Sequence, residues 1–456
     1  MAATKDMTEG SPMKLILGFS IPLLFGYLFQ QLYNLVDTMI VGQFLGVDAL
    51  AAVGATGSIN FLIIGFCNGV CSGFALPVAH RFGAKDYKSL RKLWANSIWL
   101  SGIFAIAMTI LTVILCRWIL RVMQTPENIM EYSYQYILII FIGIPTTYLF
   151  NLTSGMIRAL GNSRAPLIVL LISSALNIIM DLVFILNFHL GVSGAALATV
   201  LSQLIAGVIC VVYIRKKVSI LHLQGDEWRP HKREFMELFN AGVPMGLQYS
   251  ITAIGSVILQ TAVNTLGSAA VASVTAASKI SMFIVCPFDS MGATMATYGG
   301  QNAGGYKLDR LHKGLGSCVI LGAVYSVIAL GIIYFFGTSL LQLFVDAGEV
   351  GILNDAQKFL LINGIFYFPL ALVNIVRFMI QGMGFGVFAI LAGVLEMIAR
   401  AMIGIFFVPR FGFVAACFAS PLAWIFADAF LIPAYFSVWK KMKGHLEESA
   451  KRKALD

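Results

Sequence analysis

Twelve apolar stretches, each long enough to cross a lipid bilayer, constrain the fold of this chain more than any other feature. The bilayer core holds no water, so backbone N–H and C=O groups there must bond within the chain, and only helices and closed barrels span it. Charged residues make up 12% of the chain and the mean hydropathy is +0.85, whereas soluble chains carry about twice that charge. Since about 20 apolar residues cross the hydrocarbon as a helix, we predict an all-α polytopic membrane protein. The twelve transmembrane helices are expected near residues 15–41, 50–78, 93–116, 133–157, 166–188, 194–214, 235–263, 270–298, 314–336, 356–382, 386–408 and 413–438.

Basic residues lie mainly on one side of this predicted topology. With the N-terminus in the cytoplasm, cytoplasmic segments hold 24 of the 31 Lys and Arg residues, and the opposite side holds four. Because Lys and Arg are enriched in cytoplasmic loops, we predict a multi-pass protein of the cell (inner or plasma) membrane with both termini cytoplasmic. The net charge of +9 then reflects topology, and we expect no nucleic-acid partner because the short loops lack the context of a nucleic-acid footprint.

The second half of the chain repeats the first. Matched pairs are Leu45 to Val53 with Leu266 to Val274, Gly83 to Tyr87 with Asn302 to Tyr306, and Met156 to Gly161 with Met379 to Gly384. The spacing between matched residues is 219 to 223 throughout, which indicates an internal duplication.

The duplication predicts the domain organisation. We expect an N-lobe at 14–215 with helices 1–6, a cytoplasmic linker at 216–234, a C-lobe at 235–440 with helices 7–12, and a cytoplasmic tail at 441–456. Six spans is an even number, so both repeats enter the membrane from the same side and form two pseudo-symmetric six-helix bundles. Two such bundles suit alternating access around a fixed site.

Two carboxylates, Asp37 and Asp181, lie inside apolar segments of the first half, where no Lys or Arg lies at comparable depth. A charge at mid-bilayer costs roughly 3 kcal/mol or more, so unpaired intramembrane acids indicate a function. Asn177 shares a helix face with Asp181, and Thr199 adds a hydroxyl on the next segment. Hard oxygen ligands suit an alkali cation, and close carboxylates share a proton. We therefore predict a coupling site for H+ or Na+ at Asp37, Asn177, Asp181 and Thr199, with no other metal site and no cofactor.

Pro22 precedes Asp37 by fifteen residues on the same predicted helix. Proline removes a helical hydrogen bond, so Pro22 is either a bend point that responds to Asp37 or a static kink.

The second half carries a different set of intramembrane charges, which sums to zero: Lys279, Asp289, Arg377, Glu396, Arg400 and Asp428. Glu396 and Arg400 are four residues apart, so we predict a direct, mainly structural ion pair. Lys279 and Asp289 lie about 15 Å apart along one helix and cannot pair with each other. We regard the six as candidate cavity or structural charges.

The run from Ile21 to Gly54, the turn from Gly299 to Gly304 and the duplicated halves resemble the multidrug and toxic compound extrusion (MATE) family. The resemblance covers about residues 12–440. The constellation of Asp37, Asn177, Asp181 and Thr199 resembles the DNA-damage-inducible-type branch of this family, within the MOP flippase superfamily. The resemblance implies a V-shaped two-lobe fold and export of cationic, amphipathic drugs in exchange for H+ or Na+.

The leading hypothesis is a cation-coupled antiporter that exports organic cations by alternating access. The alternative is a flippase for a lipid-linked precursor, which should carry a strongly basic cavity that the first half lacks. We expect no enzyme, because no nucleophile or metal constellation occurs. The expected partners are organic cation substrates and membrane lipid, and the protein is expected to be a monomer.

Overall fold

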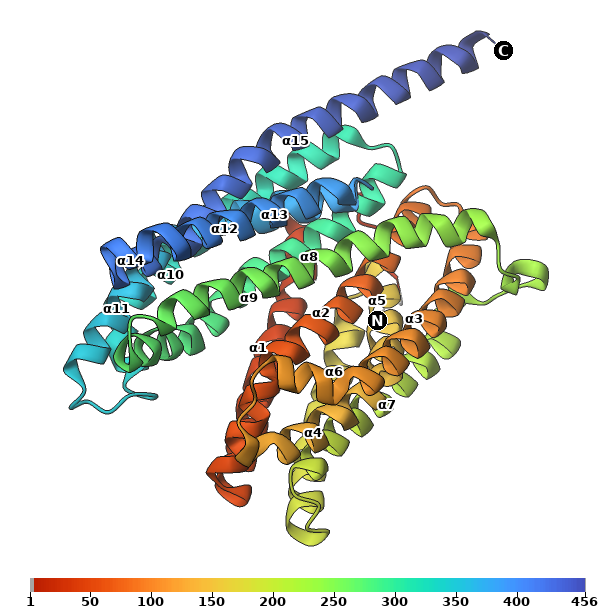
Figure 1. Cartoon of the computed structure of the whole chain (residues 1–456). Helices are drawn as coiled ribbons and strands as arrows, with labels where there is room; N and C mark the ends of the chain where they lie inside the picture. The colour runs from red at the N-terminus through yellow and green to blue at the C-terminus, as the bar shows by residue number, and fades with distance from the viewer. Residues whose placement is uncertain (1–3, 456) are drawn as a thin grey trace. The chain divides into compact units, whose positions relative to one another are not determined.

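The computed structural model describes residues 4–455, which form helices and no strand (Figure 1). The last residue of the predicted tail, 456, lies outside the described residues. The helices are α1 (Pro12–Leu45), α2 (Val47–Gly83), α3 (Tyr87–Val122), α4 (Glu127–Ile142), α5 (Ile144–Ala159), α6 (Arg164–Leu182), η1 (Val183–Asn187), α7 (Val192–Lys217), η2 (Ser219–Leu221), η3 (Gly225–Trp228), α8 (Lys232–Asn264), α9 (Ser268–Gly304), α10 (Leu308–Leu341), α11 (Val350–Ile365), α12 (Tyr367–Gly382), α13 (Gly386–Met402), η4 (Ile403–Phe407), α14 (Val408–Phe411) and α15 (Phe413–Leu455).

Within the described residues, ten helices are long and apolar enough to cross a membrane. Two bent helix pairs bring the number to twelve when each pair is taken as one span. The pairs are α4 with α5, bent by 46°, and α11 with α12, bent by 51°. The prediction of an all-α polytopic membrane protein is confirmed, and two of the predicted spans are bent.

The first bend has a local cause at Gly143, between α4 and α5. The side chain of Val200 on α7 occupies the space where a Gly143 Cβ would stand, at 2.3 Å from that position. Pro145 then follows in the first turn of α5, where its missing N–H costs no helical hydrogen bond. Glycine and proline thus end one helix and start the next in a new direction.

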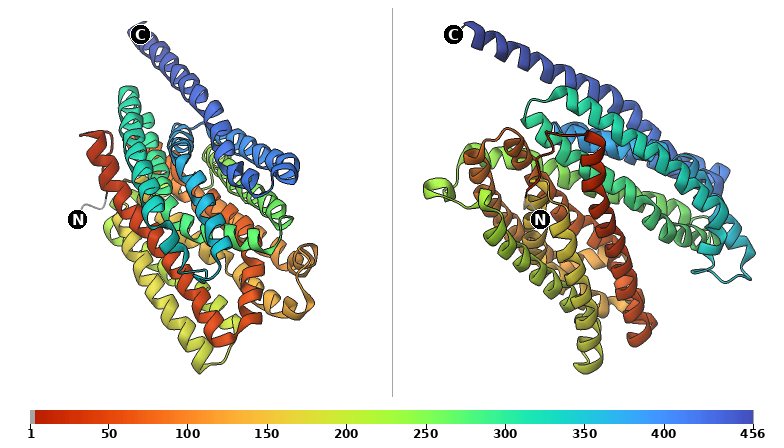
Figure 2. Two further views of the ribbon diagram at one scale, coloured as in Figure 1. Left: turned by 90° about the vertical axis from the view of Figure 1, so that its left-hand side faces the viewer. Right: turned by 180° about the vertical axis from the view of Figure 1, so that it is seen from behind.

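Contacts divide the chain into two compact units. Unit 1 comprises Met1–Asp6 and Phe25–Ser250, and unit 2 comprises Met7–Leu24 and Ile251–Asp456. The divisions fall inside the continuous helices α1 and α8. Figure 2 shows α1 as one unbroken red helix. The lobes at 14–215 and 235–440 follow the sequence repeat and stay a prediction.

Each unit is built around one long helix that packs against several others. In unit 1, α2 packs against α3, α4 and α5, and α7 packs against α4, α5 and α6. In unit 2, α9 packs against α10, α11 and α12, and α15 packs against α11, α12 and α13. The central helices α2 and α9 therefore hold equivalent places in the two repeats.

Backbone conformations with positive φ recur at matched positions of the two halves. The pairs are Gly46 with Gly267, Gly161 with Gly384, Gly191 with Gly412, and Lys85 with Tyr306. Each lies in a short connection between two helices, and at the first three pairs the residue is glycine, which adopts positive φ at little cost. The last pair corrects one sequence match: Lys85, and not Tyr87, is the counterpart of Tyr306. The sequence match followed the shared Tyr-Lys letters, whereas the turn conformation sets the true register.

The run from Gly299 to Gly304, which the sequence analysis described as a turn, forms the helical end of α9. This end of α9 and Arg310 of α10 bind the N-terminal segment within unit 2. The Met7 N–H donates to Gln301 Oε1 (2.8 Å), and Asn302 Nδ2 donates to the Met7 carbonyl (3.2 Å). Arg310 donates to the carbonyl oxygens of Met7 and Gly10 at 3.2 and 2.8 Å. These polar side chains therefore satisfy backbone groups of a non-helical segment in which Met7 and Thr8 are buried.

The linker after α7 is fixed to unit 1 by an ion pair. Arg91 on α3 donates to both carboxylate oxygens of Glu227 on η3, at 2.7 and 2.8 Å. Glu227 is buried, and these hydrogen bonds lower the pKa of its carboxyl group. Bidentate geometry makes this pair stronger than an ordinary surface ion pair.

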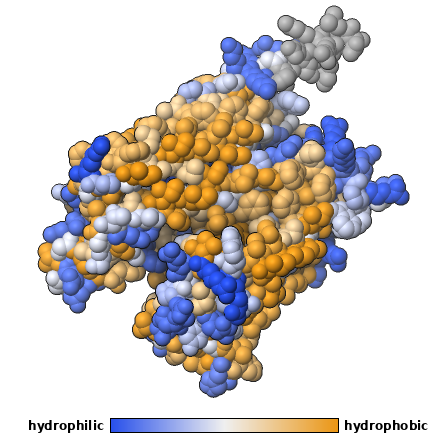
Figure 3. Space-filling view, in the orientation of Figure 1, coloured by the Kyte–Doolittle hydropathy of each residue, from blue (hydrophilic) through white to orange (hydrophobic). Residues whose placement is uncertain are grey.

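Large apolar side chains remain exposed along the sides of the helices. On α3, Ile103, Ile106, Ile110 and Ile114 follow one helix face, and each is more than half exposed. Figure 3 shows apolar side chains over the helix sides and polar ones near helix ends and connections. A soluble protein rarely exposes such continuous apolar faces, so we assign them to contact with lipid.

Candidate functional site

The two acids singled out in the first half lie side by side in unit 1. Asp37 projects from α1 and is 8% exposed, and Asp181 projects from the last turn of α6 and is fully buried. Their carboxyl groups lie within hydrogen-bonding reach of each other. Two ionised carboxylates at this distance repel strongly, so the pair requires a shared proton or a bound cation.

The Oδ1 atoms of both acids are buried and accept no hydrogen bond within the described residues. A buried carboxylate oxygen without a donor is costly. No basic side chain forms an ion pair with either acid in the described part of the chain. These two oxygens are thus available to a proton or a small cation.

Asn177 contacts Asp181 and the backbone of Thr199, the two residues that the sequence analysis grouped with it. The Asn177 amide is oriented so that both its nitrogen and its oxygen form a hydrogen bond. The nitrogen donates to Asp181 Oδ2 (3.1 Å), and the oxygen accepts from the Thr199 backbone N–H (3.2 Å). Asn177 therefore ties α6 to α7 and fixes the Asp181 carboxyl group. The Thr199 hydroxyl donates to the Ala195 carbonyl (3.1 Å).

The site also contains two tyrosines that sequence reasoning missed. Tyr33 lies one helical turn before Asp37, and its hydroxyl is within hydrogen-bonding reach of the Thr199 side chain. Tyr136 comes from α4, is buried, and is close enough to both acids to interact electrostatically. The spacing of four residues could have indicated Tyr33, but no local signal indicates Tyr136, because a separate helix brings it to the site.

A π-helical turn, η1, follows directly after the helix that carries Asp181. The matched turn η4 follows α13 in the second half. π-turns are rare and are often found at functional sites, since they widen the helix and redirect the next residues. The duplication preserves this backbone feature, whereas the acid is present only in the first half.

No group of three or more His, Cys, Asp or Glu side chains that could hold a metal ion occurs in the described residues. A cation at the acid pair would draw on carboxylate, amide and hydroxyl oxygens. That donor set suits Na+ better than a transition metal.

The predicted ion pair between Glu396 and Arg400 is present in unit 2, with Arg400 Nη2 at 3.3 Å from Glu396 Oε2. Arg377 from α12 binds the other oxygen of Glu396, which the sequence could not show. Asp428 on α15 is buried near Arg377. The other two predicted charges, Lys279 and Asp289, are exposed on α9 and form no ion pair in the described residues.

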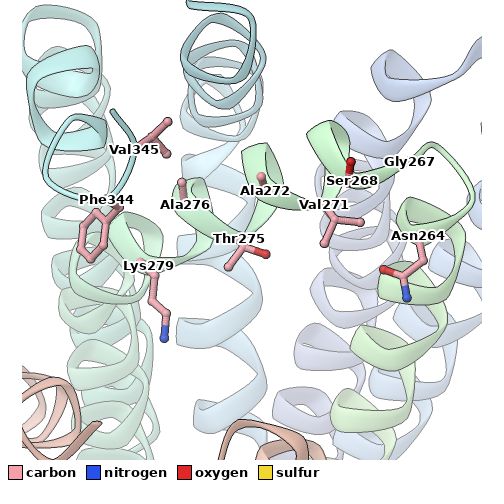
Figure 4. A pocket seen from close by; sticks show the side chains of 10 residues that line it. All are labelled: Asn264, Gly267, Ser268, Val271, Ala272, Thr275, Ala276, Lys279, Phe344 and Val345. Carbon is pink, nitrogen blue, oxygen red and sulfur yellow. The ribbon is translucent and has the colours of Figure 1, made fainter. Parts of the chain in front are cut away.

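Lys279 lines a cavity of about 620 Å³ in unit 2. Figure 4 shows its side chain on the same helix as Ser268 and Thr275, with Phe344 and Val345 from the connection after α10 on another side. This cavity is remote in sequence from the acid pair and contains none of the predicted coupling residues.

Pro22 lies inside α1 without interrupting the helix. It belongs to unit 2, whereas Asp37 on the same helix belongs to unit 1.

A duplicated helical membrane protein with charged groups buried at membrane depth has the architecture of a secondary transporter. The family model MatE matches residues 22–183 and 244–407, which is more than half of the chain. The chain therefore belongs to the MATE family of multidrug efflux transporters. The first matched range lies in the first sequence repeat, and the second lies in the second repeat.

Curated relatives are named as multidrug resistance or multidrug export proteins. The chain is 28% identical over 352 residues to the probable multidrug resistance protein YoeA of Bacillus subtilis, with 76% of each chain covered. It is 25% identical over 362 residues to the multidrug export protein MepA of Staphylococcus haemolyticus, with 78% of this chain and 80% of the relative covered.

Solved structures share the fold. A crystal structure of MATE in the bent conformation matches with a TM-score of 0.87 and 23% identity, over 97% of this chain and 98% of the other. An outward-facing MATE transporter of the MOP superfamily matches with a TM-score of 0.89 and 22% identity, over 96% and 98%.

Proposed function

We propose that this chain is an H+- or Na+-coupled antiporter that exports organic cationic or amphipathic drugs across the cell membrane by alternating access. One observation carries the proposal: two buried carboxyl groups within hydrogen-bonding reach of each other, with no basic partner in the described residues. The names of the curated relatives, which refer to multidrug resistance and export, support the substrate class.

Coupling follows from competition for the same negative charge. When Asp37 and Asp181 together hold one proton or Na+, the net charge of the pair falls from −2 to −1, and the pair attracts an organic cation less strongly. Loss of the coupling ion restores the negative charge and favours substrate binding. Asn177 and Thr199 act as secondary ligands that keep Asp181 oriented, and Pro22 provides a bend point in α1.

The constellation also supports membership of the DNA-damage-inducible-type branch, and the distribution of Lys and Arg supports cytoplasmic termini in the plasma membrane. We assign the substrates as flat or bulky monovalent cations. Carboxylates attract their charge, and the tyrosine rings beside the acids offer cation–π contact.

The test is drug transport in proteoliposomes under separately imposed pH and Na+ gradients. Wild-type protein is expected to export an organic cation under at least one gradient. Asp37→Asn and Asp181→Asn should each abolish gradient-driven export, since each removes one carboxylate from the pair. The matched control is Asp48→Asn, because Asp48 is an exposed acid in the first turn of α2.

Unchanged export by both acid variants would refute the coupling site. Preferential export of anionic compounds by the wild type would refute the substrate class. Size-exclusion profiles in detergent confirm that each variant is folded before its transport is compared.

A further inference from the structure

Unit 2 contains a buried charge cluster that the proposed coupling site does not use. It consists of Arg377 on α12, Glu396 and Arg400 on α13, and Asp428 on α15, and each side chain is less than a tenth exposed. Charged side chains are almost never this buried unless they are paired. The repeat-equivalent positions in unit 1 are uncharged: Ser154, Ser173, Asn177 and Gly207.

The hydrogen bonds within this cluster are distributed unevenly between its two acids. Glu396 binds both arginines, with Oε1 on Arg377 and Oε2 on Arg400. Asp428 is near Arg377 and interacts with it electrostatically. However, its buried Oδ1 has no hydrogen-bond partner within the described residues.

The charge balance depends on Asp428. Glu396 and the two arginines carry a net charge of +1, so an ionised Asp428 makes the cluster neutral and a protonated Asp428 leaves it positive. An ionised buried carboxylate requires a hydrogen-bonded partner. For Asp428, the guanidinium group that interacts with it electrostatically is that of Arg377. The observed arrangement, with Arg377 bound to Glu396, suits the protonated form of Asp428.

Other titratable groups near α15 lie farther along the helix. Asp355 and Lys358 of α11 interact electrostatically with Cys417. Cys417 is about 16 Å from Asp428 along the axis of α15. On the other side of Asp428, His312 of α10 contacts Tyr435. On the same side as Cys417, Tyr367 of α12 contacts Trp424, which lies one helical turn before Asp428. Arg377 is therefore the charged group with the most direct influence on Asp428.

We propose that Asp428 is a second proton-binding residue of this transporter, and that its ionisation draws Arg377 away from Glu396. Arg400 stays with Glu396 in both states, so that acid keeps a partner. The proton comes from water and returns to it, and no other bond forms or breaks. The exchange ties α12 to α13 when Asp428 is protonated and to α15 when it is ionised.

The inference rests on the proposed function, because a buried proton site serves an ion-coupled exporter. It is tested independently of transport by infrared spectroscopy of the full-length protein in lipid nanodiscs between pH 6 and 10. Ordinary exposed carboxyl groups have pKa values of about 4 and do not titrate in this range. The carbonyl stretch of a protonated carboxyl group therefore reports buried acids.

The spectra are compared in a background that lacks the unit 1 pair, Asp37→Asn with Asp181→Asn. We expect a pH-dependent carbonyl band in this background, loss of its Asp428 component when Asp428→Asn is added, and return of that component with Asp428→Glu. Asp289→Asn is the matched control, because Asp289 is an acid of the same unit without an arginine partner, and it should leave the Asp428 band unchanged. Identical spectra with and without Asp428→Asn would overturn the inference.

A second variant tests the role of Arg377. Without its positive charge, the ionised form of Asp428 is less favourable, so the band should persist to higher pH in Arg377→Gln. An unmoved titration would overturn the proposed exchange. Drug export by the wild type, measured in parallel under pH and Na+ gradients, decides the proposed function separately, because the infrared band does not depend on substrate.

Discussion

A close contact between the backbones of two helices in unit 2 provides the first structural prediction. Gly382, at the end of α12, faces the backbone of α9. A Cβ at this position would lie 2.5 Å from the Ala296 carbonyl oxygen and 3.0 Å from the Gly300 nitrogen. Both neighbours are backbone atoms of a long helix and cannot turn aside as a side chain does.

The expected cost of Gly382→Ala follows from this geometry. Ordinary contacts of a Cβ begin near 3.4 Å, so α12 and α9 must separate by several tenths of an ångström along their interface. Overpacking of this kind costs about 1–3 kcal/mol, and the separation also weakens neighbouring dispersion contacts. For a cooperative unit of about 200 residues, this corresponds to a decrease in Tm of roughly 3–9 °C.

The assay is thermal unfolding in detergent, followed with a thiol-reactive dye that fluoresces when buried cysteines become accessible. Gly331→Ala on α10 is the matched control, because a Cβ there meets nothing within 4 Å. The control should keep or slightly raise Tm, since alanine has the higher helix propensity. A Tm for Gly382→Ala equal to that of Gly331→Ala would refute the close-packing argument.

Three further predictions address the site, the linker and the cysteines. Asn177→Ala removes the amide that donates to Asp181 (3.1 Å), and a hydrogen bond to a charged group is worth about 1.5–3 kcal/mol. The donated N–H stabilises the ionised carboxylate, so its loss favours protonation. The proton concentration that half-saturates H+-driven export should therefore fall by roughly 10- to 100-fold, and an unchanged value would contradict the assigned role of Asn177. The folded-state pKa of Glu227 is lowered by Arg91, so its stabilising contribution is fully present above the unfolded value of about 4.3 and is lost as pH falls through the folded value. The fluorescence of Trp228, which contacts Trp99, should report linker release in acid for the wild type, whereas Glu227→Gln should show no such pH dependence. All seven cysteines are buried and unpaired, so maleimide should label none in the folded protein and seven after denaturation, and rapid labelling of the native state would contradict their burial.

The amino-acid sequence by itself determined the class of fold. Long apolar stretches fix helices because the bilayer leaves the backbone no other partner, and the repeat fixes two similar halves. It also identified Asp37 and Asp181, because a charge in an apolar segment is costly wherever that segment packs. The pairing of Glu396 with Arg400 followed from helical spacing alone.

Tertiary structure decided which distant residues meet. Tyr136 reaches the acid pair and Arg377 reaches Glu396 because separate helices bring them there, and a helix-local spacing rule carries no such information. The bend at Gly143 depends on how closely Val200 approaches it. The match between Lys85 and Tyr306 became visible only in backbone conformation. Sequence patterns report the free-energy cost of placing a residue in a membrane, whereas contacts between helices arise from packing that no single segment encodes.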